Sequence, residues 1–184
     1  MSSPVILKVK CRTYLIRFLE HTFGPQPIAF PRKHDFNNIL DFLLAKPPLD
    51  YHEPDYGEET LEIKLPYFED KDVRSYNYLS AFKQDKFEAR IAQYFKIVYH
   101  AEINKYINLA FLRKDAIELF MDEYNLPVDC IDMLEKDYSR YLTIRWKRKL
   151  FRNNKSSSDN RDKNGLLELC QEPNCTEKLE KKET

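Results

Sequence analysis

The spacing of the hydrophobic residues changes at about Ser80, and this change limits the folds open to the chain. Before it, residues 5–11 and 60–66 each place an apolar side chain at every second position. Such alternation is typical of half-buried strands. After it, apolar residues recur every three or four positions to about residue 151, which predicts helices. We therefore predict an α+β fold, in which a small mixed part of strands and helices precedes a predominantly helical half.

The mixed part contains two predicted helices. The first covers about residues 14–23 and ends at Gly24, which is followed by a proline. The second is predicted to begin with Asp35 as its N-cap and to end before Pro47. Its inner face would hold Phe36, Ile39, Leu40, Leu43 and Leu44. Residues 47–59 are acidic and rich in proline, which predicts a surface loop.

Three helices are predicted after Ser80. The first is long and admits a break at residues 99–101. Its apolar positions are Phe82, Phe87, Ile91, Tyr94, Phe95, Val98, Ile103, Tyr106, Ile107 and Ala110. The second covers about residues 113–124, and residues 125–127 turn the chain into the third, at about residues 128–151. Asn125 suits this turn because asparagine tolerates the left-handed conformation.

Length and composition indicate one domain with a polar extension. Residues 1–153 are predicted to form a single α+β domain, with a mixed part at 1–78 and a helical part at 79–153. Residues 154–184 are rich in Asn, Ser, Asp and Lys, which predicts a disordered tail. No segment approaches the roughly 18 apolar residues that span a bilayer, and the N-terminus lacks the apolar run of a signal peptide. We expect a cytoplasmic protein without a membrane partner.

The composition disfavours several classes of enzyme. Three glycines are too few for phosphate loops or dinucleotide fingerprints, which need several for close backbone approach. The four histidines fall singly, so they form no ligand pair at helical spacing. The four cysteines are expected to be reduced thiols; they are Cys11, Cys130, Cys170 and Cys175. We assign no catalytic residue, no metal site and no cofactor from these patterns.

Charge is unevenly distributed along a chain whose formal net charge is zero. Residues 115–137 carry eight acids and one base, whereas residues 138–155 carry seven bases and no acid. Lys and Arg side chains that contact phosphates release counterions, so the basic segment suits DNA or RNA. A solvated helix without a ligand can have the same composition. The candidate nucleic-acid-binding residues are Arg140, Arg145, Lys147, Arg148, Lys149 and Arg152.

A helix-turn-helix unit is one interpretation of residues 113–150. Phe120, Tyr124, Leu126 and Ile131 give the spacing Phe-x3-Tyr-x-Leu-x4-Ile. This spacing resembles the C-terminal helical unit of bacterial replication initiators of the DnaA kind, over fewer than forty residues, and the resemblance implies DNA binding. The start of the second helix departs from such a unit, because its aspartates at 129 and 132 repel phosphate, so we expect DNA contact at the far end of this helix. An ordinary helical hairpin is the alternative.

A metal-dependent nuclease is another interpretation. Asp55, Glu62 and Lys64 have the residue types of Pro-Asp…Glu-x-Lys nucleases, in which carboxylates hold Mg²⁺ and the lysine stabilises an attacking hydroxide. Alternating charges on an exposed strand explain Glu62 and Lys64 without a metal. The short gap between Asp55 and Glu62 would force both into one tight hairpin, and the sheet and helix that usually surround such a site are not evident in the sequence.

Two further clusters leave alternatives open. The aromatic and acidic segment 67–78 either presents side chains to a base or a protein groove, or seals the sheet edge with an aspartate capping a turn.

The early bases either extend the C-terminal basic surface or pair with the acids of residues 50–72. These bases are Lys8, Lys10, Arg12, Arg17, Arg32 and Lys33.

Over residues 5–145 the chain is similar to small uncharacterised proteins of gut-bacterial phages and mobile elements. The similarity rests on the turn at 31–34, the segment 65–72 and the helix at 114–120. It implies a setting in which small proteins are often DNA-binding regulators or accessory factors. We predict a non-enzymatic, DNA-binding factor of this kind. The alternatives are a protein-interaction module that binds a partner or a second copy, and the nuclease.

Overall fold

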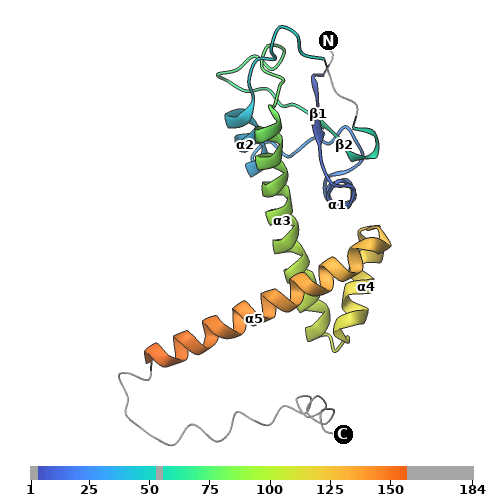
Figure 1. The fold of residues 1–184 in the computed structure, drawn as a ribbon, viewed down its shortest axis with the longest axis vertical. Helices are drawn as coiled ribbons and strands as arrows, with labels where there is room; N and C mark the ends of the chain where they lie inside the picture. The colour runs from blue at the N-terminus through green and yellow to red at the C-terminus, as the bar shows by residue number, and fades with distance from the viewer. Residues whose placement is uncertain (1–3, 53–55, 157–184) are drawn as a thin grey trace, which may run out of the picture. The chain divides into compact units, whose positions relative to one another are not determined.

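The structure is a computed structural model that describes residues 4–52 and 56–156, with side chains described through residue 148. Its elements follow the order β1, α1, α2, η1, β2, α3, α4, η2, α5, where η marks a short 3-10 helix (Figure 1). The predicted α+β class, with a helical second half, is confirmed. The chain divides into two compact units, residues 1–139 and 140–184, and the boundary falls inside α5.

The two predicted strands pair with each other. β1 (Ile6–Lys10) and β2 (Thr60–Lys64) are antiparallel, with Leu7 opposite Ile63. Their alternating apolar side chains are buried, as the period of two predicted. Ile28 lies along the other edge of β2, where its N–H donates to the Glu62 carbonyl at 2.9 Å and its carbonyl accepts from Lys64 N–H at 2.9 Å. This contact covers backbone groups that an edge strand would otherwise expose.

The helices of the mixed part end as expected, but the N-cap of the second was predicted wrongly. α1 (Thr13–Phe23) ends at Gly24, whose φ of 100° lies in the region that favours glycine. α2 (Asp35–Leu43) is capped by His34, whose Nδ1 accepts from the Phe36 N–H at 3.2 Å. Asp35 is instead the first helical residue, where its charge still favours the positive end of the helix dipole.

The long helix α3 (Ala81–Asn108) runs without a break. Its buried stripe passes through residues 99–101, because Tyr99 stacks on Phe95 and packs against Phe120, with ring centroids 5.9 and 5.1 Å apart. These contacts hold the segment where a break was an option. Phe82, the first apolar position of the predicted helix, lies off this stripe: its ring is exposed, and Lys86 lies over it at 4.3 Å.

The turn after α4 (Arg113–Glu123) is a Schellman motif. Asn125 adopts φ = 49°, as predicted, and its N–H donates to the Asp122 carbonyl. The N–H of Leu126 donates to the Met121 carbonyl at 2.9 Å, and the Leu126 side chain is buried. A short 3-10 helix, η2 (Val128–Cys130), then leads into α5 (Ile131–Ser156). A similar short helix, η1 (Gly57–Glu59), precedes β2.

An aromatic cluster joins the mixed part to the helical part within residues 1–139. Phe18 of α1 lies 5.1 Å from Phe95 of α3 and 5.5 Å from Tyr124 at the end of α4, measured between ring centroids. Phe120 of α4 stacks on Tyr124 at 4.4 Å. Of the predicted tail, residues 154–156 continue α5, and residues 157–184 lie outside the described part.

Candidate nucleic-acid interface

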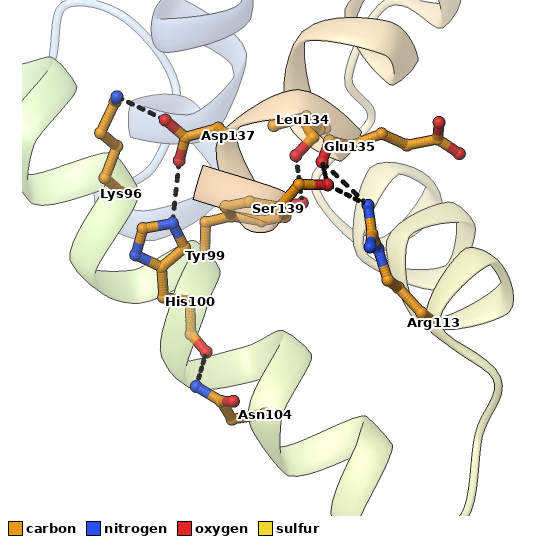
Figure 2. A network of polar contacts seen from close by, with 9 residues as sticks. All are labelled: Lys96, Tyr99, His100, Asn104, Arg113, Leu134, Glu135, Asp137 and Ser139. Atoms are coloured by element: carbon orange, nitrogen blue, oxygen red, sulfur yellow. Dashed lines mark hydrogen bonds and ion pairs between the residues drawn. The ribbon is translucent and has the colours of Figure 1, made fainter. Parts of the chain in front are cut away.

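The first turns of α5 are held to α3 by a shared carboxylate. Asp137 accepts from the Lys96 ammonium at 2.5 Å, and its other oxygen lies 2.8 Å from Nε2 of His100 (Figure 2). Burial opposes the ionisation of Asp137, but the hydrogen bonds from Lys96 and His100 outweigh it and hold its pKa below the ordinary value. Asp137 is therefore a carboxylate at neutral pH, bound by two residues one turn apart on α3.

Hydrogen bonds from tyrosine and arginine complete this attachment. The buried Tyr99 hydroxyl donates to the Leu134 carbonyl at 2.9 Å, and burial raises the pKa of Tyr99, so that the donor proton is retained. Arg113 of α4 donates to the Glu135 carbonyl at 3.0 Å and to Ser139 Oγ at 2.5 Å (Figure 2). Both α3 and α4 thus fix the beginning of α5.

The predicted basic residues follow from there along the same helix. Arg140, Arg145, Lys147 and Arg148 are exposed, and the side chains of Lys149 and Arg152 lie outside the described part. Helical spacing of three and four puts positions 145, 148, 149 and 152 on one face. Positions 140 and 147, which are seven apart, share a different face. The helix therefore divides the six candidates between two faces.

Apolar side chains accompany these bases. Leu142, Ile144 and Trp146 are exposed, and Trp146 is the most exposed of the three at 63%. Leu142 and Trp146 are four positions apart and so lie on one side of the helix. Together with Thr143 and Arg145 they line a surface pocket. The segment thus combines an open aromatic ring with guanidinium groups, an arrangement that the charge pattern alone did not single out.

The start of α5 has the opposite character. Asp129 in η2 and Asp132 in the first turn of α5 are both exposed. Exposed carboxylates repel phosphate, so this end is poorly suited to enter a DNA groove. The hairpin of α4 and α5 has the predicted turn, but only the later part of α5 has the charge for a polyanion.

The nuclease residues are not brought together by the described part of the chain. Asp55 lies outside it, while Glu62 and Lys64 lie on β2, on the face opposite the buried Leu61 and Ile63. Glu62 is opposite Lys8 in the strand pairing. Across residues 4–52 and 56–156, no group of three His, Cys, Asp or Glu side chains is placed to hold a metal ion. The nuclease stays a prediction.

Lys10 and Arg12 of the early bases, and Asp72 of the segment 67–78, make contacts within the fold. Lys10 pairs with Glu59 at 3.3 Å, which agrees with the alternative that the early bases pair with acids of residues 50–72. Arg12 pairs with Glu88 of α3 at 2.6 Å, a partner outside that range. In the segment 67–78, Asp72 accepts from the Arg74 N–H and the Ser75 hydroxyl. Asp72 thus caps a turn, one of the two roles expected for this segment.

No protein-family model, curated protein or solved structure matches the chain. Its similarity to phage and mobile-element proteins therefore stays a prediction. Within the described residues, no helix is both long enough and apolar enough to cross a bilayer.

Proposed function

We propose that the protein is a non-enzymatic, DNA-binding regulator or accessory factor of a phage or mobile element, and that it binds through the later part of α5. One observation carries the proposal: Arg145 and Arg148 are exposed on one helical face, in a segment of 18 residues, 138–155, that contains no acid. Lys149 and Arg152 occupy further positions of this face by helical spacing. Phosphates of one strand could thus meet several cations.

The zero net charge of the chain does not oppose this proposal. Electrostatic attraction is screened over about 8 Å at physiological ionic strength, so the local charge decides whether a phosphate is attracted. The attachment of Leu134, Asp137 and Ser139 to α3 and α4 also matters, because it keeps the first turns of α5 helical. A helix that is already formed loses less conformational entropy on binding than one that folds on its ligand.

The test is a fluorescence-anisotropy titration of labelled DNA at low and physiological salt, with Arg145→Gln and Arg148→Gln combined. We expect affinity to weaken about 10-fold or more, and the slope of log Kd against log salt to fall by about one for each phosphate contact removed. The matched control combines Lys86→Gln with Lys114→Gln, which removes two exposed charges from α3 and α4. Equal affinity of both double variants contradicts the placement on α5.

A protein-interaction module is the second candidate. Leu109, Phe111 and Leu112 in the connection between α3 and α4 are all exposed. Neighbouring apolar side chains at a surface are typical of interaction sites. Sedimentation velocity at rising protein concentration tests self-association. If the protein self-associates, the double variant Leu109→Ser, Leu112→Ser should remain a monomer. A concentration-independent monomer that binds DNA favours the first candidate.

A further inference from the structure

We infer that the nucleic acid recognised by this protein is single-stranded and that an unpaired base stacks on Trp146. The inference rests on the proposed function and adds to it the class of ligand and the contact that selects it. It starts from the exposure of Trp146, a residue that is 63% exposed on a helix with many basic side chains. Base–aromatic stacking strengthens single-strand binding by about 5- to 100-fold per base and tolerates any sequence.

The neighbours of Trp146 suit a nucleotide. Leu142, Thr143, Arg145 and Trp146 line one pocket, which offers an apolar wall, a hydroxyl and a guanidinium around the indole. A base could stack on the ring while the guanidinium of Arg145, which lines the same pocket, takes a flanking phosphate. Aromatic and cationic side chains interleaved along one element are the usual platform for an unpaired strand.

Duplex DNA uses this arrangement less well. In a duplex the faces of the bases are covered by their neighbours, so an indole can stack on a base only if two adjacent base pairs are first unstacked. A helix that reads the major groove usually inserts its N-terminal residues, and here that end exposes Asp129 and Asp132. The distribution of charge and the open indole therefore favour an unpaired strand.

A second copy of the chain is a poorer occupant of this surface. Leu142 and Trp146 could pair with the same residues of another molecule, but the Arg145 guanidinium groups of both copies, which line the same pocket, would then be brought together. Like charges that face each other across an interface oppose association. A polyanion neutralises the same guanidinium groups, so charge complementarity favours nucleic acid.

The chain contains a single tryptophan, so its intrinsic fluorescence reports on Trp146 alone. The full chain is titrated with an oligothymidylate of about 15 nucleotides, a length that covers typical single-strand sites, and with a duplex of the same length. We expect the oligothymidylate to quench the fluorescence and to bind more tightly than the duplex. In parallel, anisotropy with labelled oligonucleotides measures the DNA affinity of two variants. Trp146→Leu keeps apolar bulk, and Trp146→Phe keeps an aromatic face.

We expect Trp146→Leu to weaken single-strand binding by about 5- to 100-fold, and Trp146→Phe to restore most of the affinity, with little effect of either on duplex binding. The control is Tyr67→Leu, which removes another exposed aromatic ring and should change nothing. The stacking inference is overturned if the single strand binds without quenching the fluorescence and the Trp146→Leu variant binds it with wild-type affinity. This result leaves the proposed function standing. Tighter binding of duplex than of single strand also overturns it. Absence of binding to either DNA, even at low salt, overturns both.

Discussion

Nε2 of His100 lies 2.8 Å from Oδ2 of Asp137, a contact that ties the middle of α3 to the first turns of α5. Lys96, one turn earlier on α3, binds the other oxygen of the same carboxylate. The side chain of Asp137 retains only 16% of its surface, so its charge depends on these two partners in place of water. This ionised group is thus one of the contacts that hold the first turns of α5 against α3.

Asp137→Asn should destabilise the fold by about 1–3 kcal/mol, because it removes a charged acceptor from two partly buried donors. Urea denaturation followed by circular dichroism measures the change. The control is Glu118→Gln, which breaks an exposed pair with Lys114 and should cost less than about 0.5 kcal/mol. Equal stability of the Asp137→Asn variant and the wild type would show that the carboxylate does not hold the helices together.

The same contact predicts how stability depends on pH. The pKa of Asp137 is lower in the folded than in the unfolded chain, because the hydrogen bonds from Lys96 and His100 outweigh burial. Its contribution is therefore complete above the unfolded pKa, about 4, and disappears as the pH falls through the lower folded value. We expect the stability difference between wild type and Asp137→Asn to be constant above about pH 5 and to shrink in acid. A difference that grows in acid contradicts this assignment.

The parts of the fold that sequence predicted are those with a local signal. The alternation that includes Leu7 and Val9 requires only a strand with one buried face, and the Asn125 turn requires only a residue that tolerates positive φ. Phe82 shows the limit of such signals, because it is apolar and helical but lies five positions before Phe87, roughly 140° around the helix axis, and so falls outside the buried stripe of α3. Spacing predicts a helix, whereas exposure depends on where that helix meets its neighbours.

The attachment of the helix that carries the basic residues was predicted only in part for the same reason. The run of bases in residues 138–155 is visible in the sequence, but the contact of Asp137 with His100 joins residues 37 positions apart. No local pattern shows which acid meets which base. The four-residue spacing of Lys96 and His100 was the one available hint, since such residues share a helical face. Trp146 was likewise missed, because a lone aromatic is equally typical of a core.

Asn125→Ala should cost about 1 kcal/mol, because alanine is strained at a φ of 49° while asparagine is tolerated there. Asn125→Gly should be stable to within a few tenths of a kcal/mol, since glycine adopts this conformation freely. The two variants together separate the backbone effect from loss of the side chain, and thermal or urea denaturation measures both. If glycine is as harmful as alanine, the amide of Asn125 has a role of its own.

Cys11 should resist thiol reagents in the native protein. Its side chain is buried, and burial together with the nearby Glu88 raises its pKa to about 12, so the reactive thiolate is scarce at neutral pH. A variant in which Cys130, Cys170 and Cys175 are replaced by Ser isolates this thiol. We expect negligible labelling by a chromogenic disulfide reagent at pH 8 and complete labelling in denaturant. Rapid native labelling would mean that β1 opens readily.

The hydroxyl and the ring of Tyr99 contribute separately to the attachment of α5. Tyr99→Phe removes the donor to the Leu134 carbonyl and keeps the ring contacts, which should cost about 1 kcal/mol. Tyr99→Leu also removes the rings' contacts with Phe95 and Phe120, so it should cost about 3 kcal/mol or more. Urea denaturation measures both, and Tyr67→Phe, at an exposed position, should leave stability unchanged. If Tyr99→Phe unfolds like the wild type while Tyr99→Leu does not, Tyr99 stabilises the fold through the packing of its ring, and its hydrogen bond to Leu134 adds nothing measurable.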